Sequence, residues 1–238
     1  MGDTVIVITG ASEGIGYECA KAVLDRTNAS VLVTSRHAEK LQRAREGLPS
    51  PQRNRLRTQV CDQGDPRALA ELLTILAAPD EPLEGAILAV GVNPLYGEGP
   101  RRLHALDAGT IDDTIRINCT HTLRITSALL GRFRRQRAGV LIWIGSQAAR
   151  LGMPGAALYG ATKAFLSGLA VAAHREYAGR GVRLHLLHPG LVRTPRTLAV
   201  ADEFGAKHGL PVAEAADVAR RVVDVFLAGD PAAVEMDL

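Results

Sequence analysis

The sequence is poor in aromatic residues, in cysteine and in long apolar runs, and each shortage excludes a class of protein. Aromatic residues make up only 4% of the 238 residues while 47% are hydrophobic, so a core must come from Ala, Val, Leu and Ile. With 22% charged residues, this composition excludes a disordered chain. Cys19, Cys61 and Cys119 lie far apart without metal-ligand spacing, which predicts reduced core thiols in a cytoplasmic protein and no metal site.

The absence of long apolar runs argues against insertion into a membrane, and the small net charge gives no reason to expect a nucleic-acid partner. The best apolar run, at 140–145, is far shorter than the ~20 residues that a membrane span requires. No basic region precedes the first apolar run at 5–8, so we expect no signal peptide. Lys and Arg together number 28 against 25 acids, a net charge of +3 that demands no nucleic acid. The basic run 132–137 is interpreted as a solvated helix end that complements the helix dipole.

Short β-branched runs alternate with longer amphipathic stretches along the whole chain. The continuously apolar run 5–8 must be covered on both faces, which is typical of a parallel sheet between helix layers. The predicted fold is therefore α/β, a single-domain, doubly wound, Rossmann-like sheet of about seven strands over residues 1–238. Segments 47–55 and 93–102 are predicted to be loops. The predicted strands are 4–9, 30–35, 56–61, 85–90, 139–145, 182–188 and 234–236, and the predicted helices are 15–26, 38–46, 66–77, 111–135, 156–178 and 212–227.

A glycine-rich turn follows the first predicted strand directly. Residues 9–16 read Thr-Gly-Ala-Ser-Glu-Gly-Ile-Gly and lead into a predicted helix. Gly10, Gly14 and Gly16 allow a tight turn and a close approach of the backbone to phosphate, and the helix N-terminus offers unpaired N–H groups. Because the turn lies between a strand and a helix, it predicts a pyrophosphate site, although a purely structural turn stays possible.

The glycine spacing resembles that of the short-chain dehydrogenases/reductases, and the resemblance covers residues 4 to about 227. It implies a nicotinamide dinucleotide cofactor held near the glycine turn and near the ends of the following strands. Asp62 matches the position that contacts adenine. Leu88 and Ala89 stand where the family has two asparagines, while Gly91 is kept. The implied cofactor-binding residues are Gly10, Ser12, Gly14, Ile15, Gly16, Arg36, Asp62, Gly91, Tyr159, Lys163, Pro189, Gly190, Val192 and Thr194.

The end of the second predicted strand bears on the choice between NADP(H) and NAD(H). An acid there would bind the adenosine ribose and select NAD(H), but the chain has Ser35 and Arg36. A guanidinium can pair with a 2′-phosphate, which favours NADP(H). Glu13 in the glycine turn argues the other way, because it would repel a phosphate. NAD(H) therefore stays as the less favoured alternative.

The family's catalytic spacing Tyr-x-x-x-Lys occurs twice, so the spacing alone cannot identify the active site. Tyr17 and Lys21 lie one turn inside the helix after the glycine turn, where we interpret them as a surface pair or a packed ring. Tyr159, which precedes Lys163 by four positions, lies thirteen residues after Ser146, a hydroxyl at the end of a predicted strand. The strand end and the start of the helix that carries Tyr159 should both reach the carboxyl edge of the sheet.

The resemblance implies four catalytic residues: Asn118, Ser146, Tyr159 and Lys163. A phenol has an unperturbed pKa of ~10, which a nearby ammonium lowers, so that Tyr159 can exchange a proton with a substrate oxygen. Ser146 would donate a hydrogen bond to that oxygen, and Asn118 would hold a water in a proton relay. The implied reaction is hydride transfer between NADP(H) and a carbonyl/alcohol pair, as a ketone or aldehyde reductase. An NAD-dependent alcohol dehydrogenase and a non-catalytic NADP-binding regulatory protein are the alternatives.

The sequence says less about the substrate site than about the cofactor site. We expect a substrate loop at about 191–211 and a homodimer or homotetramer that pairs the helices 111–135 and 156–178. The small substrate could meet an apolar wall, and arginines near the mouth could meet an anionic group. The candidates are Trp143, Leu151, Met153, Leu191 and Leu198 for the wall, and Arg150, Arg193 and Arg196 for the mouth.

Overall fold

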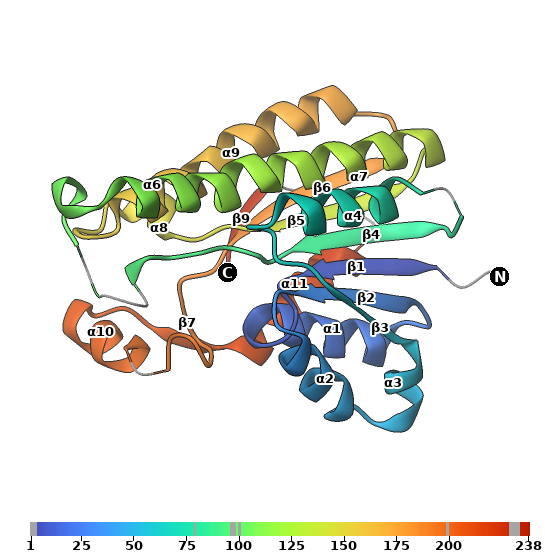
Figure 1. The fold of residues 1–238 in the computed structure, drawn as a ribbon, viewed down its shortest axis with the longest axis horizontal. Coiled ribbons are helices and arrows are strands. Elements are labelled where there is room, and N and C mark those ends of the chain that lie inside the picture. The colour runs from blue at the N-terminus through green and yellow to red at the C-terminus, as the bar shows by residue number, and fades with distance from the viewer. Residues whose placement is uncertain (1–3, 79, 96–98, 100, 199, 229–233) are drawn as a thin grey trace.

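A seven-stranded parallel sheet forms the centre of the protein (Figure 1). The structure is a computed structural model that describes residues 4–78, 80–95, 99, 101–198, 200–228 and 234–238. The strand order β3-β2-β1-β4-β5-β6-β9 runs outward in both directions from β1 and β4, which confirms the predicted doubly wound fold. The strands are β1 (Val5–Thr9), β2 (Ser30–Ser35), β3 (Leu56–Val60), β4 (Leu83–Leu88), β5 (Gly139–Ile144), β6 (Val182–His188) and β9 (Glu235–Asp237).

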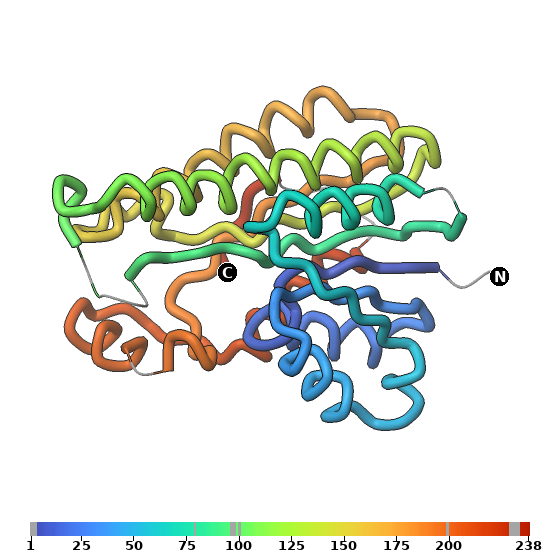
Figure 2. Tube along the Cα trace, in the orientation of Figure 1, coloured from blue at the N-terminus to red at the C-terminus, as the bar shows by residue number. Residues whose placement is uncertain are grey.

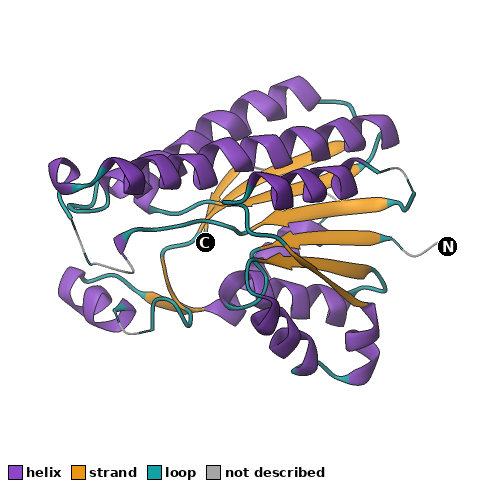
Figure 3. Ribbon diagram, viewed as in Figure 1, coloured by secondary structure: helices purple, strands orange, loops and turns teal. Residues whose placement is uncertain are grey.

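Helices cover both faces of this sheet (Figure 3). Alternate residues of β1 serve the two layers, since side chains along a strand point to opposite faces. One layer contains α1 (Gly14–Arg26), α2 (Ala38–Glu46) and α11 (Ala215–Leu227), and the other contains α4 (Pro66–Ala77), α7 (Thr122–Gln136) and α9 (Ala157–Tyr177). Ile6 and Ile8 pack with the first layer, whereas Val5 and Val7 pack with the second.

Several elements differ from the prediction. Segment 47–55 is not a loop throughout but contains the helix α3 (Ser50–Arg55), and the guanidinium of Arg55 donates to the carbonyl oxygens of Thr27 and Ala29. The predicted helix 111–135 is α6 (Ala108–Ile115) followed by a π-helical turn, η2 (Arg116–His121), and then α7. Residues 212–214 form the strand β8 (Val212–Glu214), which pairs with β7 (Leu191–Arg193), instead of a first helical turn.

The basic run 132–137 also differs from the expected solvated helix end. Arg132 is buried, and its guanidinium donates to the carbonyl oxygens of Leu76 and Glu81. The guanidinium of Arg135 donates to the oxygen of Ala77 at 3.2 Å. Helix C-termini leave carbonyl groups without intrahelical partners. The two arginines therefore cap the C-terminus of α4, and their charges complement its dipole as well as that of α7.

The chain segments that follow β4, β5 and β6 leave the sheet on the same side (Figure 2). They include the short elements η1 (Leu103–Ala105), α8 (Ala148–Leu151), β7 and α10 (Ala201–His208). Ligands of doubly wound sheets bind at this carboxyl edge. Among the described residues, no helix combines the length and apolar character needed to cross a bilayer. Cys19 and Cys61 are buried, and burial raises the pKa of the Cys61 thiol to about 11.

Candidate active site

The glycine turn opens a cavity of about 430 Å³ at the carboxyl ends of β1, β2, β3 and β4. Gly16 is required by close packing, because a Cβ there would lie 2.5 Å from the carbonyl oxygen of Gly10. α1 begins at Gly14 without a side-chain cap, which leaves its N–H groups available at the cavity. Of the predicted cofactor residues, Gly10, Ser12, Gly14, Ile15, Gly16, Arg36, Asp62, Gly91 and Thr194 line this cavity.

Three other predicted cofactor residues, Pro189, Gly190 and Val192, lie outside that lining. Gly190 lines a second cavity instead, and Val192 is buried in the core with α11. The cavity side of this segment is supplied by the residues just after it, 194–197. The Pro-Gly turn therefore lies between the two cavities and delivers the following loop to the first one.

Near the end of β2, the first cavity carries a positive charge that was not predicted from the sequence. Lys40, on α2, forms an ion pair of 2.7 Å with Glu13, and both residues line the cavity. Arg36 is exposed, and its Nε donates to His37 Nε2 at 3.0 Å. The hydroxyls of Ser12 and Ser35 are 2.8 Å apart. Lys40 thus neutralises the acid that argued against a 2′-phosphate.

The turn after β3, which carries the predicted adenine contact Asp62, forms another part of the cavity lining. The carboxylate of Asp62 accepts a hydrogen bond from the Gly64 N–H at 2.8 Å. Gln63 was not among the predicted cofactor residues, but it is buried and lines the cavity. Neither polar atom of its carboxamide has a hydrogen-bond partner within the described ranges. An amide with a free donor and a free acceptor suits the edge of a nucleobase.

A second cavity, of about 490 Å³, adjoins the segment after β5 and is mostly apolar. Ser146 and Tyr159 both line it, so the segment after β5 and the helix α9 contribute to the same cavity, as their order in the chain predicts. Ser146 Oγ accepts a hydrogen bond from the Ala148 N–H at 3.2 Å, which leaves the hydroxyl proton to donate elsewhere.

Lys163 lies beside this pair and is fully buried. Its Nζ donates to the carbonyl oxygen of Ile144 at 2.9 Å and is 5.7 Å from the centroid of the Tyr159 ring. Burial lowers the pKa of Lys163 to about 8, and the neighbouring Cys119 opposes the change. The group is therefore mainly an ammonium at pH 7, and its charge favours the phenolate form of Tyr159.

Asn118 lies in the π-helical turn and ties three segments together. Its carboxamide donates to the carbonyl oxygen of Val92 and to Thr162 Oγ1, and accepts from the Val92 N–H at 2.8 Å. The Thr162 hydroxyl in turn donates to the carbonyl oxygen of Tyr159 at 2.8 Å. Asn118 thus anchors the chain after β4, where the expected asparagines are replaced by Leu88 and Ala89. Both N–H groups of its carboxamide are used, so any water bound by its side chain must donate to the second lone pair of Oδ1.

The substrate residues expected from the sequence are partly wrong. Leu151, Met153 and Leu191 line the second cavity, but Trp143 lies in the core, where its Nε1 donates to Thr126 Oγ1 at 2.9 Å. Leu198 lies outside the lining and is 61% exposed. Side chains along a strand point alternately to the two faces of the sheet. Trp143 therefore points into one helix layer and its neighbours in β5 point into the other, so none of them lines the second cavity.

The three arginines expected at the mouth are held elsewhere. Arg150 pairs with Glu235 and Asp237, and Arg193 pairs with Asp202 and Glu214. Arg196 lines the first cavity and donates to the carbonyl oxygen of Gly91. Lys207, His208 and the acid Glu203, all on α10, line the second cavity instead.

In the second Tyr-x-x-x-Lys pair, the Tyr17 ring is partly buried and packs against the core, whereas Lys21 makes a surface ion pair. The Tyr17 hydroxyl donates to the carbonyl oxygen of Ala44 at 3.0 Å, and Lys21 pairs with Glu18 at 2.7 Å. Both residues lie outside the described linings of the two cavities.

Comparison with known proteins identifies similar sequences and folds over almost the whole chain. The sequence profile described as short chain dehydrogenase (adh_short) matches residues 4–203. The 2,3-dihydro-2,3-dihydroxybenzoate dehydrogenase of Escherichia coli is 31% identical over 241 residues, covering 94% of this chain and 88% of the relative. The 3-oxoacyl-[acyl-carrier-protein] reductase FabG of Escherichia coli is 26% identical over 234 residues, covering 96% and 91%. The solved structure of ElxO with NADP bound has a similar fold, with a TM-score of 0.85 at 20% identity over 100% of this chain and 98% of that one.

Proposed function

The chain belongs to the short-chain dehydrogenase family of oxidoreductases, and we propose that it transfers hydride between NADP(H) and a carbonyl/alcohol pair, acting as a ketone or aldehyde reductase. The observation that carries this proposal is the shared cavity of Ser146 and Tyr159, with the buried ammonium of Lys163 beside them. The name of the FabG relative, a 3-oxoacyl reductase, agrees with carbonyl reduction.

Reduction of a carbonyl needs hydride at carbon and a proton at oxygen. A nicotinamide bound in the first cavity would supply the hydride. Tyr159 gives its phenolic proton to the substrate oxygen, and Lys163 stabilises the phenolate that remains. Ser146 donates its free hydroxyl proton to the same oxygen, where negative charge develops. Asn118 holds the main chain around Val92 and, through Thr162, the first turn of α9 that carries Tyr159.

The first cavity fits a dinucleotide. The glycine turn and the uncapped start of α1 suit a pyrophosphate. Asp62 and Gln63 offer an acceptor and an amide to adenine. Of the twelve positions implied for the cofactor outside the catalytic pair, the nine in the lining are retained in this proposal, and Pro189, Gly190 and Val192 act by shaping the loop 194–197.

NADP(H) is favoured over NAD(H) by the charge around the adenosine end. Arg36, His37 and Lys40 line the cavity there, and the acids in the same lining are Glu13 and Asp62. Because Lys40 pairs with Glu13, a 2′-phosphate meets a neutralised carboxylate and the Arg36 guanidinium. The NAD-dependent alcohol dehydrogenase stays the second candidate, since Glu13 is free to bind ribose hydroxyls if Lys40 turns away.

The segment 191–211 is proposed to be the substrate loop, because β7 and α10 supply much of the second cavity's lining. We also propose a homodimer or homotetramer in a cytoplasmic setting. Small residues suited to a close helix–helix contact lie on one exposed face of α9, namely Ala161, Ala164, Gly168 and Ala172.

A cofactor and substrate screen tests the proposal. Purified protein would be titrated with NADPH and with NADH, and then supplied with a panel of ketones and aldehydes while NADPH absorbance is followed. We expect tighter binding of NADPH than of NADH and carbonyl-dependent oxidation of NADPH. Binding of NADPH without turnover of any carbonyl or alcohol would instead indicate a non-catalytic, NADP-binding regulatory protein.

A further inference from the structure

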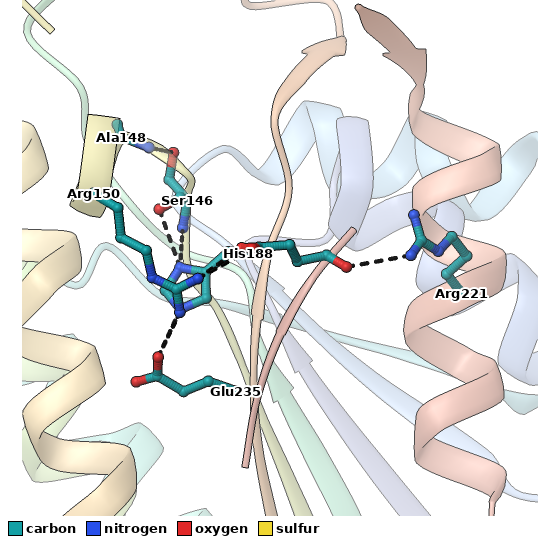
Figure 4. Close-up of polar contacts among 7 residues, drawn as sticks. Ser146, Ala148, Arg150, His188, Arg221 and Glu235 are labelled. Carbon is teal, nitrogen blue, oxygen red and sulfur yellow. Dashed lines mark hydrogen bonds and ion pairs between the residues drawn. The ribbon is translucent and has the colours of Figure 1, made fainter. Parts of the chain in front are cut away.

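A buried imidazole lies directly behind Ser146, at the end of β6 (Figure 4). The side chain of His188 has no exposed surface, and its Nδ1 is 3.3 Å from the Ser146 nitrogen and 3.1 Å from the Ser146 carbonyl oxygen. Gly145 makes this approach possible, because a Cβ there would lie 2.7 Å from Nδ1. The imidazole therefore contacts the backbone of the proposed hydrogen-bond donor on both sides of its Cα.

The other ring nitrogen faces the C-terminal strand. Glu235 Oε2 of β9 is 3.6 Å from His188 Nε2, which is too long for a hydrogen bond but near enough for the charge of the carboxylate to act on that nitrogen. Arg150 of α8 holds the same carboxylate oxygen at 2.6 Å, and Arg150 also pairs with Asp237. Burial would raise the pKa of Glu235, but the Ser167 hydroxyl, Arg150 and His188 hold it below its usual value. Glu235 is therefore a carboxylate at neutral pH.

When the imidazole carries a single proton, the carboxylate of Glu235 favours Nε2 as the nitrogen that holds it. A proton on Nε2 points toward Oε2, whereas a lone pair there would face a negative oxygen. With the proton on Nε2, Nδ1 has a lone pair and accepts the Ser146 N–H. With the proton on Nδ1, the contact would move to the Ser146 carbonyl oxygen. The two tautomers thus hold Ser146 by different backbone groups.

We propose that His188 is a positioning residue for Ser146, and that Glu235 on the C-terminal strand selects the tautomer through which it acts. The inference rests on the proposed role of Ser146 in carbonyl reduction. The imidazole fixes the Ser146 N–H, the Ala148 N–H fixes Oγ, and the hydroxyl proton is thereby aimed into the substrate cavity. His188 itself is fully buried behind the strand end and does not touch the substrate.

Two substitutions at this position separate the contact with Ser146 from the contact with Glu235. An asparagine amide reaches the position of Nδ1, whereas a glutamine amide reaches that of Nε2. His188→Gln should lower kcat roughly 10- to 100-fold with KM and the NADPH Kd little changed, because a displaced donor acts mainly on the transition state. His188→Asn should recover most of that loss. His185→Gln, at a buried histidine of the same strand paired with Ile142, is the matched control and should leave kcat near that of the natural protein.

A double-mutant cycle shows whether the effect passes through Ser146. In the Ser146→Ala background the hydroxyl is absent, so His188→Gln should lower kcat by less than about 3-fold. An equal loss in both backgrounds, or no loss from His188→Gln in the folded protein, would overturn the proposal.

The tautomer can be read without any turnover, which separates this inference from the proposed function. In protein labelled with ¹⁵N-histidine, NMR at neutral pH should show His188 protonated at Nε2 and unprotonated at Nδ1. Glu235→Gln should shift that population toward Nδ1–H. A proton on Nδ1 in the natural protein would overturn the inference even if carbonyl reduction is observed. If no carbonyl is reduced but the predicted tautomer is found, the proposed function fails while the positional contact stands.

Discussion

Replacing Lys163 by methionine should abolish turnover and yet stabilise the protein at neutral pH. The ammonium is fully buried, and burial lowers its pKa from 10.5 to about 8. This difference means that folding the charged form costs about 3 kcal/mol at pH 7. Methionine fills a similar volume without a charge, but it loses the hydrogen bond to the Ile144 oxygen, a loss of about 1 kcal/mol. We expect Lys163→Met to be more stable than the natural protein by roughly 2 kcal/mol at pH 7.

The sign of the pH dependence follows from the direction of that pKa change. Between about pH 8 and pH 10.4 the unfolded chain binds more protons at Lys163 than the folded protein does, so this residue makes stability rise with pH. From pH 7 to pH 9.5 the contribution is about 2 kcal/mol. Lys163→Met lacks it, so urea denaturation should show its stability advantage nearly disappearing at pH 9.5. A difference between the two proteins that stays constant with pH would refute the reasoning from a buried ammonium.

Four further outcomes are expected. Arg36→Ala should weaken NADPH binding by about 1.5–3 kcal/mol more than NADH binding in fluorescence titrations, and equal losses would contradict the assigned 2′-phosphate contact. Glu13→Gln should release Lys40 and tighten NADPH binding severalfold while leaving NADH nearly unchanged; weaker NADPH binding would show that the ion pair organises the site instead. Gly16→Ala should lower the free energy of unfolding by about 1–3 kcal/mol and weaken both cofactors alike, because its Cβ would contact the Gly10 oxygen. Light scattering at micromolar concentration should give a multiple of 25.3 kDa, and a monomer would contradict the proposed assembly.

The sheet and the Ser146–Tyr159 pairing could be predicted because they depend on periodicity and on chain order. Apolar runs of strand length fix parallel strands, and parallel strands bring the segments after them to one edge. Chain order then brings a hydroxyl after β5 and a phenol on α9 to the same cavity. The two Tyr-x-x-x-Lys spacings could be ranked for the same reason, since only one follows such a strand end.

The partners of long charged side chains could not be predicted, because they are chosen by the tertiary structure. Arg150 turns to β9 and not to the substrate cavity, and Lys40 reaches Glu13 across 27 positions of the chain. Arg132 is buried against α4 although it belongs to the basic run 132–137. A buried histidine such as His188 carries no spacing signal at all, since its role depends on Gly145 leaving room for the ring.

The most direct test of the account compares Tyr159→Phe with Tyr17→Phe. Each substitution removes one hydroxyl and keeps the ring, and each tyrosine precedes a lysine by four positions. Tyr159→Phe should lower kcat by ~10²–10⁴-fold or more, while the NADPH Kd stays within a few-fold, because the glycine turn and Arg36 are untouched. Tyr17→Phe should leave kcat within a few-fold, since its hydroxyl only meets the Ala44 oxygen. Near-normal turnover by Tyr159→Phe on every carbonyl that the natural protein reduces would contradict the assignment of the active site.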